Sequence, residues 1–325
     1  MIDMDNQKWH IGVVGLGLMG TSIASAMILL GHRVTGLSPV DSESDRSAPG
    51  RVRKAVRQAI ERGLVSGDEE KYFDLIDFSN DYRSLSSCEL VIESIIEDLA
   101  AKQLVLTQIE GVVSTNAVIT TNTSAIPINI LQQFLRFKSR FFGMHWGEPA
   151  FTSKFLEIIC GDKSDLDLGE KLQQMALEWG KEPTLVRKDI RGFITNRLMY
   201  AMYREAFYLV ENGYASMKDI DRACRNDGGV WMAFCGPFRY MDLTGLQAYY
   251  KVMKDLFPTL DNRTTVPDFI EKIVSKGSNG ISTGEGFYSY TPEEAEAWEA
   301  AFEAFSFELS QLKNEHPPKA LKDLL

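Results

Sequence analysis

A histidine and a glutamate in this chain have the types and the spacing suited to proton transfer. The stretch GMHWGEPAFTSKFLE contains His145 and, twelve positions later, Glu157. His145 ends the apolar segment SRFFGMH, and Glu157 lies inside the apolar segment KFLEIIC. If the second segment runs back against the first, the carboxylate can accept from one ring nitrogen while the other nitrogen takes a substrate proton. A capped structural histidine beside a solvated glutamate fits the same spacing, so both interpretations stay open.

A glycine-rich turn near the start of the chain could hold a phosphate group. The apolar run IGVV leads into six residues that form this turn: Gly15, Leu16, Gly17, Leu18, Met19 and Gly20. In a strand–turn–helix unit the first glycine permits the tight turn, the second lets the backbone approach a pyrophosphate, and the third lets the helix pack on the strand. The helix N-terminus then presents its N–H groups to the anion. The pattern predicts dinucleotide binding, with a purely structural turn as the alternative.

The residue expected to hold the adenine ribose is less typical. HRVTGLS reads as the second strand, and an acidic residue at its end normally accepts a hydrogen bond from the ribose 2′-hydroxyl. Ser38 occupies that place, and a serine can donate to a ribose hydroxyl or to a 2′-phosphate. Arg46, Arg51 and Arg53 lie downstream, but no arginine directly follows Ser38. The sequence therefore favours NAD as the cofactor and leaves NADP open.

Alternating strand-like and helix-like segments bring these residues to one edge of a sheet. The segments that read as strands are 10–15, 32–38, 90–95, 117–122, 139–145, 154–160 and 183–189, with helices between them at 20–30, 52–63 and 98–112. Such alternation predicts a parallel, doubly wound sheet with helices on both faces. Ligands collect at the carboxyl ends of parallel strands. The edge that carries the glycine turn must therefore also carry Asn122, Ser124 and His145.

The second half of the chain has a different pattern. After Gly192 the sequence shows long helical periodicity, beginning with FITNRLMYAMYREAFYLVENG. We therefore expect an α/β dinucleotide-binding domain over residues 1–190 and an all-helical domain over 191–325. The first helix of this second half is apolar over much of its circumference, so it needs cover on more than one side. This predicts a homodimer formed through the helical half.

Composition excludes several other classes of protein. The net charge of −10 over 325 residues argues against nucleic-acid or anionic-membrane binding, which need basic patches. The four cysteines, Cys88, Cys160, Cys224 and Cys235, are scattered, so neither a metal site nor a disulfide framework is expected. The start MIDMDNQKWH lacks the pattern of a secretory signal, and no apolar run reaches membrane-spanning length. We expect a cytoplasmic enzyme or binding protein with a small-molecule ligand.

Longer stretches resemble the 3-hydroxyacyl-CoA dehydrogenase family, in the same order and over nearly the whole chain. They are VGLGLMG, VIESIIEDLAAKQ, TTNTSAIPI, FGMHWGEP with KFLEII, GFITNRLMYAMYREAFYLVENG, CGPFRYMDLTGL and STGEGFYSY. The resemblance implies a Rossmann domain followed by a C-terminal all-helical dimerisation domain, and a role in fatty acid metabolism. It implies that His145 is the general base and Glu157 its partner, and that Ser124 and Asn196 bind the substrate oxygen.

The same resemblance implies that Glu97 and Lys102 border the cofactor. Three other positions that lie near the cofactor in the family depart from its pattern. Ser38 replaces the ribose acid, Glu148 replaces the asparagine after the catalytic histidine, and Ser282 replaces the lysine before TGEG. Asn122 is a further candidate for a cofactor contact. The departures leave open which side chains contact the nicotinamide end of the cofactor.

Three functions remain in view from the sequence. The first, which the sequence favours, is NAD-dependent interconversion of the 3-hydroxyacyl group of an acyl-CoA substrate and its 3-oxo form. Arg51, Arg53, Lys54 and Arg57 lie on one predicted helix and could meet CoA phosphates, although a charged helix face is usually only solvated. The long segment GGVWMAFCGPF and the motif GMHW favour relatives that act on small CoA-free substrates, such as gulonate, carnitine or pyridine-carboxylate dehydrogenases. The third possible function is that of a crystallin-like protein that binds NAD but catalyses no reaction.

Overall fold

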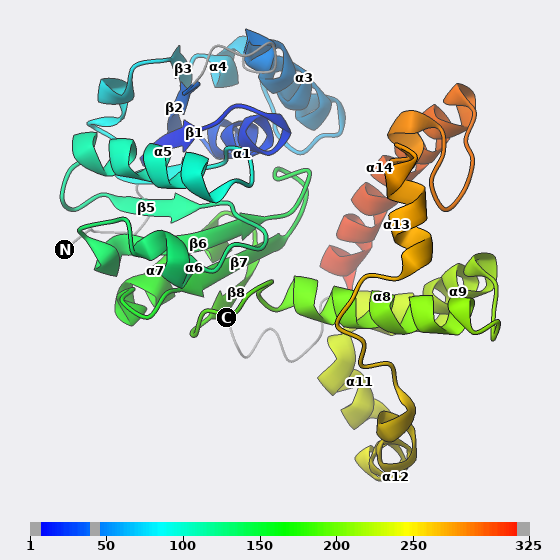
Figure 1. The fold of residues 1–325 in the computed structure, drawn as a ribbon. Helices are drawn as coiled ribbons and strands as arrows, with labels where there is room; N and C mark the ends of the chain where they lie inside the picture. Colours follow the sequence, from blue (N-terminus) through cyan, green and yellow to red (C-terminus); the bar gives the residue numbers. More distant parts are fainter. Residues whose placement is uncertain (1–7, 40–45, 317–325) are drawn as a thin grey trace. The chain divides into compact units, whose positions relative to one another are not determined.

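The computed structural model describes residues 8–39 and 46–316 (Figure 1). The chain divides into two compact units, Met1–Arg197 and Leu198–Leu325, and the division falls inside helix α8 (Thr195–Glu211). The amino-terminal segment on which the absence of a secretory signal was argued lies mostly outside the described residues.

The first unit is built on one sheet of eight strands in the order β3-β2-β1-β4-β5-β6-β7-β8. Their bounds are β1 His10–Val14, β2 Arg33–Leu37, β3 Ile76–Ser79, β4 Leu90–Glu93, β5 Val118–Thr121, β6 Phe141–Trp146, β7 Phe155–Cys160 and β8 Glu182–Val186. Strands β1 to β6 pair in parallel, β7 runs antiparallel to β6, and β8 is parallel to β7. The expected Rossmann-type sheet is confirmed, with two strands reversed at one side.

Strand β3 was not predicted from the sequence. It comprises only IDFS, lies at the edge of the sheet beside β2, and has a single buried residue, Ile76. An edge strand with one buried side chain lacks the apolar run by which the other seven strands were recognised.

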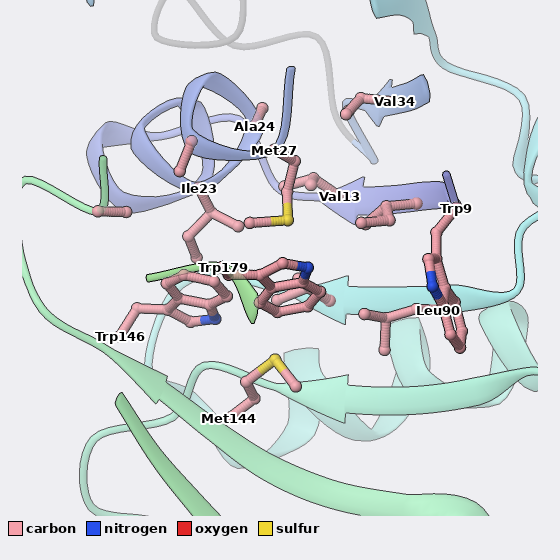
Figure 2. Close-up of a cluster of buried hydrophobic side chains, with 14 of the residues drawn as sticks. Trp9, Val13, Ile23, Ala24, Met27, Val34, Leu90, Met144, Trp146 and Trp179 are labelled. Carbon is pink, nitrogen blue, oxygen red and sulfur yellow. The ribbon is translucent and has the colours of Figure 1, made fainter. Parts of the chain in front are cut away.

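Helices cover both faces of the sheet. One face packs against α1 (Leu18–Leu29), α3 (Ala48–Glu61) and α7 (Leu166–Glu178), and the other against α5 (Leu99–Val112) and α6 (Ile128–Gln132). The strands alternate between these two cores, since Val13 belongs to the first and Val14 to the second. Figure 2 shows the first core, where α1 packs over the strands. The short elements of this unit are α4 (Glu69–Phe73) and the 3-10 turns Tyr82–Leu85 and Lys138–Arg140.

A buried lysine fixes the loop that follows β6. Trp146 and Trp179 stack with ring centroids 5.8 Å apart (Figure 2), and the Lys181 ammonium lies 5.5 Å from the Trp146 ring. That ammonium donates to the carbonyl of Ala150 and, at 2.6 Å, to the carbonyl of Ser153. Burial lowers the pKa of Lys181 from its ordinary value of 10.5 to about 8. The loop is thus held by the Lys181 side chain, whose charged form is destabilised by its burial.

The second unit is helical. After α8 come α9 (Met217–Ala223), a π-helical turn (Cys224–Gly228), α10 (Gly229–Phe234), α11 (Gly236–Thr244), α12 (Leu246–Leu256), a 3-10 turn (Phe257–Thr259), α13 (Asp268–Ser275), a 3-10 turn (Ile281–Thr283) and α14 (Pro292–Glu315). A capping box begins α14, because Thr291 and Glu294 each bind the other's backbone N–H. Phe207, Phe269 and Phe287 form an aromatic cluster. Within the described part of the chain, no helix is long and apolar enough to cross a membrane.

Candidate active site

The glycine turn has the geometry expected of a pyrophosphate site. Gly15 adopts φ +92°, a conformation that favours glycine, and its N–H donates to the carbonyl of Leu37 at the end of β2. Helix α1 begins directly after Gly17, and no side chain caps its first turn. The N–H groups of Leu18, Met19 and Gly20 are therefore available to an anion. Leu18 is exposed and Leu16 is buried, so the turn offers backbone rather than side-chain polarity. These features fit NAD.

Ser38 follows β2 at the same edge of the sheet. Its N–H donates to the carbonyl of Ser79, the last residue of β3, which holds the backbone in place. Nearby, the Arg51 guanidinium of α3 donates to the Leu16 carbonyl (2.5 Å) and to the Thr21 hydroxyl (3.4 Å). Helix α3 thus places a cation against the glycine turn. The binding of the ribose by Ser38 remains a prediction.

The structure brings His145 and Glu157 together. The two residues stand directly opposite each other in the antiparallel β6–β7 pair, and His145 Nδ1 lies 2.9 Å from Glu157 Oε2. The His145 side chain is 12% exposed and the Glu157 side chain 1%. The rings of Phe155 and Phe193 lie 5.3 and 5.8 Å from the imidazole centroid, so they restrict its orientation. The carboxylate fixes the Nδ1–H tautomer and leaves Nε2 to exchange a proton.

The second oxygen of Glu157 is bound by the start of α8. Oε1 accepts from the N–H groups of Ile194 (3.1 Å) and Thr195 (3.0 Å) and from the Thr195 hydroxyl (3.2 Å). Burial alone would raise the pKa of Glu157, but the hydrogen bonds from His145, Thr195 and Ile194 outweigh it and hold the pKa below its ordinary value. Glu157 is therefore ionised beside the histidine.

A left-handed turn makes these contacts possible. Gly192 has φ +78° and the buried Phe193 has φ +51°, a conformation uncommon for a residue with a side chain. The turn directs the next two N–H groups at Glu157. This contact was not predicted from the sequence, although a threonine immediately before a helical run is a typical helix-start signal.

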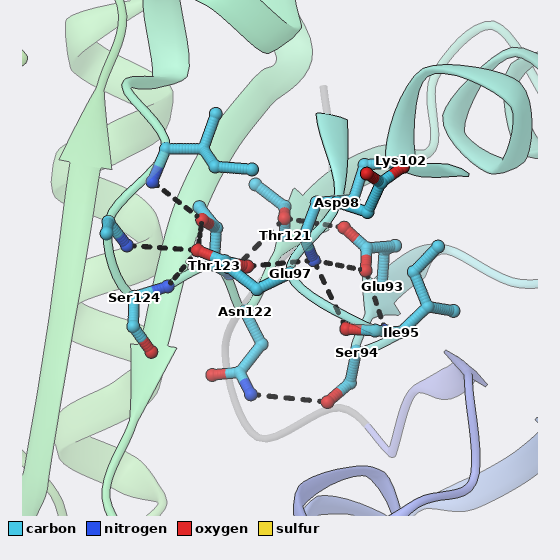
Figure 3. Close-up of polar contacts among 12 residues, drawn as sticks. Glu93, Ser94, Ile95, Glu97, Asp98, Lys102, Thr121, Asn122, Thr123 and Ser124 are labelled. Carbon is cyan, nitrogen blue, oxygen red and sulfur yellow. Dashed lines mark hydrogen bonds and ion pairs between the residues drawn. The ribbon is translucent and has the colours of Figure 1, made fainter. Parts of the chain in front are cut away.

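A second carboxylate, which is partly exposed, organises the loop after β5. Glu97 Oε1 accepts from the Thr123 hydroxyl (2.5 Å) and from the N–H groups of Ser124 and Ala125 (each 3.1 Å) (Figure 3). Burial raises the pKa of Glu97, but the Thr123 hydrogen bond, the Lys102 charge and the two N–H groups lower it below its ordinary value overall. The ionised Glu97 therefore positions Ser124.

Lys102 is more enclosed than a residue that touches a ligand directly. Its side chain is 1% exposed, and its ammonium lies 2.7 Å from Glu93 Oε1 and 3.5 Å from Glu97 Oε2 (Figure 3). Glu93 also accepts from the Thr121 hydroxyl and the Ile95 N–H. The ammonium of Lys102 is thus engaged by two carboxylates, and the cofactor contacts of Glu97 and Lys102 remain predictions.

Asn122, Ser124 and Asn196 lie near one another. Asn122 Oδ1 accepts from the Trp146 N–H (2.9 Å), which ties the end of β5 to the residue after His145. Its Nδ2 donates to the Ser94 hydroxyl (3.2 Å). Asn196 Nδ2 donates to the Ser124 carbonyl (2.8 Å), and the Ser124 hydroxyl extends away from Glu97 in Figure 3. Asn196 thus contacts the backbone of Ser124, and the binding of a substrate oxygen by these two residues remains a prediction.

Glu148 lies in the loop beyond β6. It is exposed, and its carboxylate hydrogen-bonds the Ser22 hydroxyl of α1. The Ala150 N–H also donates to the Ser22 hydroxyl (2.8 Å), which joins this loop to the helix that begins at the glycine turn. A cofactor contact by Glu148 remains a prediction. Within residues 8–39 and 46–316, no group of His, Cys, Asp and Glu side chains could hold a metal ion.

Two protein-family models match the chain over most of its length. Residues 10–190 match the NAD binding domain of 3-hydroxyacyl-CoA dehydrogenase, and residues 192–290 match its C-terminal domain. The first match contains the glycine turn, His145 and Glu157, and the second contains Thr195 and Asn196.

Individual proteins of two kinds are similar to the chain. 5-Formyl-3-hydroxy-2-methylpyridine 4-carboxylate 5-dehydrogenase of Mesorhizobium japonicum is 32% identical over 294 residues, which cover 90% of the chain and 94% of that protein. Human mitochondrial hydroxyacyl-coenzyme A dehydrogenase is 31% identical over 290 residues, which cover 86% of the chain and 91% of that protein.

Solved structures separate these two kinds. The crystal structure of the pyridine-carboxylate 5-dehydrogenase, described as an NAD+-dependent dismutase, aligns with a TM-score of 0.84 at 30% identity and covers 94% of this chain and 98% of that one. (S)-3-Hydroxybutyryl-CoA dehydrogenase from Ralstonia eutropha aligns with a TM-score of 0.70 at 28% identity and covers 88% of this chain and 100% of that one. Of these two structures, the pyridine-carboxylate enzyme agrees better with the chain.

Proposed function

The chain belongs to the 3-hydroxyacyl-CoA dehydrogenase family and is an NAD-dependent dehydrogenase, and from this premise we propose that it oxidises a compact substrate without CoA. The substrate is a small hydroxy acid or an aldehyde in its hydrated form. The glycine turn would hold NAD, which would supply the hydride acceptor for the carbon that bears the hydroxyl.

His145 takes the hydroxyl proton in this reaction. Its Nδ1–H is held by Glu157 at 2.9 Å, so Nε2 carries the lone pair that accepts the proton. The Glu157 carboxylate then stabilises the imidazolium that forms. The Ser124 hydroxyl and the second N–H of the Asn196 amide donate to the substrate oxygen as it becomes a carbonyl.

The observation that carries the choice of substrate is the pairing of the α3 arginines. Arg53 Nη1 lies 3.1 Å from Glu69 and 2.6 Å from Glu70, and Arg57 Nη2 lies 3.1 Å from Glu69. Two of the basic side chains of α3 thus face two carboxylates, and the charges of these four groups sum to zero. Arg53 and Arg57 therefore attract the phosphates of CoA less than unpaired guanidinium groups would, while Arg51 of the same helix donates to the Leu16 carbonyl and the Thr21 hydroxyl. The TM-score of 0.84 with the pyridine-carboxylate enzyme supports the same choice.

An acyl-CoA thioester is the second candidate. The 31% identity to the human hydroxyacyl-coenzyme A dehydrogenase favours it. In that case the chemistry at His145 is unchanged, and the 3-hydroxy group of the acyl chain is oxidised to a 3-oxo group.

Steady-state kinetics decide between the two. The purified protein is assayed with NAD+ and a panel of small hydroxy acids and aromatic aldehydes, and with NADH and acetoacetyl-CoA. We expect the larger kcat/KM on a CoA-free compound, and a strong preference for acetoacetyl-CoA would overturn the proposal. Glu70→Gln gives a matched control, because it frees the Arg53 charge and should lower KM for acetoacetyl-CoA while leaving a small substrate unaffected.

We also propose a homodimer formed through the helical unit. No residue of the described helices α8 to α14 is buried in the single chain, and Leu198, Tyr200, Tyr250, Trp298 and Phe302 each expose more than half of their surface. Apolar surface of this extent is typical of an interface. Light scattering at micromolar concentration should give twice the monomer mass of 36.6 kDa, and the mass of one chain would contradict the proposal.

A further inference from the structure

The Glu157 carboxylate serves two elements at once. Its Oε2 holds His145 Nδ1 at 2.9 Å, while its Oε1 accepts the N–H groups of Ile194 and Thr195 and the Thr195 hydroxyl. The two N–H groups belong to the backbone and are present whatever side chains stand at these positions. The hydroxyl is different, because it depends on the residue at position 195.

Donors on one oxygen weaken the other as an acceptor. Each hydrogen bond to Oε1 stabilises the carboxylate charge, so less of that charge is available to hold a proton on the imidazole. The N-terminus of α8 acts in the same direction through its dipole. The strength with which Glu157 favours the protonated histidine is therefore set by what binds Oε1.

We propose that the Thr195 hydroxyl is a positioning group that limits how strongly Glu157 holds the protonated His145, and so sets the pH range in which the base works. This inference rests on the proposed role of His145 as the base. Thr195 does not touch the substrate in the proposal; it acts through Glu157 alone.

Among the described residues, three charged groups near the pair need to be considered besides His145 and Glu157. His145 is the titratable side chain whose hydrogen bond and charge act on Glu157. On the α8 side, Arg197 donates to the carbonyl of Arg191 at 3.4 Å. On the β5 side, Glu97 and Lys102 lie 3.5 Å from each other and form their own ion pair. A substitution of Thr195 should therefore act first on the charge of Glu157 and, through it, on the protonation of His145.

NMR titration of the histidine rings tests the proposal in the free protein, without turnover. The chain has four histidines, and His145→Gln assigns the resonance of interest. Thr195→Val removes the hydroxyl with little change of shape, and should move the titration midpoint of His145 upward by about half a pH unit, the effect of one hydrogen bond. Thr195→Ser keeps the hydroxyl and should match the parent. Glu157→Gln removes the charge and should move the midpoint downward.

The opposite signs of the two shifts distinguish tuning from general damage. An unchanged midpoint in Thr195→Val, or a shift in the direction of Glu157→Gln, overturns the proposal. Thr195→Ala repeats the test if valine disturbs packing, and because Thr195 is exposed, both variants should fold. The pH profile of kcat/KM should follow the NMR midpoints. If the midpoints shift as expected but no compound is turned over, the proposed substrate fails while the role of Thr195 stands.

Discussion

A Cβ atom at Gly20 would lie 1.8 Å from the carbonyl oxygen of Gly15, whereas a Cβ atom at Gly17 would meet nothing within 4 Å. Gly20 therefore allows α1 to close against the end of β1. Gly17 faces open space at the helix N-terminus. A side chain at this position would therefore clash only with a bound ligand, not with the protein. The two glycines of one motif have separate physical roles.

Alanine substitutions should separate these roles. Gly20→Ala is expected to destabilise the protein, because backbone would have to shift to admit the methyl group. Gly17→Ala should leave the thermal unfolding temperature close to that of the parent but weaken NADH binding, measured by fluorescence titration. Equal losses of affinity and stability in Gly17→Ala would show that the turn does not approach the pyrophosphate.

Removal of the base should lower turnover without loss of the cofactor. His145→Ala is expected to reduce kcat by about a hundredfold to ten-thousandfold, the usual contribution of a general base. NADH affinity should stay nearly unchanged, because the glycine turn holds the dinucleotide. His10 at the start of β1 hydrogen-bonds Thr35, and His10→Gln serves as a control that should retain activity. A kcat within a fewfold of the parent in His145→Ala would rule out the base.

Removal of the Glu157 charge should change the pH dependence. Glu157→Gln keeps hydrogen-bonding atoms but no longer stabilises an imidazolium, so the acid limb of the kcat/KM profile should move to lower pH, with a smaller rate loss than in His145→Ala. The exposed pair of Glu170 with Arg187 offers Glu170→Gln as the matched control. A profile that superimposes on the parent's would mean that the two residues are uncoupled.

The residue after β2 should respond to an added carboxylate. Ser38→Asp supplies an acceptor for the ribose 2′-hydroxyl and repels a 2′-phosphate, so the preference for NAD over NADP should increase. Fluorescence titration with NADH and NADPH measures this preference in parent and variant. Tighter binding of NADPH than NADH by the parent would contradict the expected role of Ser38.

The buried Lys181 should leave a signature at alkaline pH. Its pKa is lowered from 10.5 to about 8 in the folded chain, so between these values the unfolded state binds more protons. Stability must then rise with pH across this window, by on the order of 3 kcal/mol. Chemical denaturation from pH 7.5 to 10.5 should show this rise in the parent and in the exposed Lys171→Met, but not in Lys181→Met. A parallel rise in Lys181→Met would assign it to other groups.

Seven strands and three of the helices between them, α1, α3 and α5, were predicted because their apolar residues are continuous or periodic. The edge strand Ile76–Ser79 has neither property. The glycine turn and the pair of His145 and Glu157 were also accessible, since strand order places them at one edge and the register then sets them opposite each other.

The remaining parts of the site depend on three-dimensional geometry that a sequence does not display. The N–H groups that bind Glu157 are directed by the φ of +51° at Phe193, a conformation that the residue type disfavours. From the sequence, Lys102 would be interpreted as an ordinary lysine on a helix. Its side chain is in fact buried and pairs with Glu93 and Glu97. Arg53 and Arg57 of α3 suggest a phosphate site in the sequence, but their partners Glu69 and Glu70, which begin the short helix α4, appear only in the structure.

The contact between Glu157 and the start of α8 limits how the chain can be cut or recombined. A fragment that ends at residue 190, where the match to the NAD binding domain ends, keeps all eight strands and the glycine turn. It loses three of the four described hydrogen bonds of Glu157 and leaves that carboxylate inside the protein with His145 alone. A chimera that exchanges the helical half with that of a relative should therefore be joined beyond the first turn of α8, so that Ile194 and Thr195 stay with the strand whose carboxylate they hold.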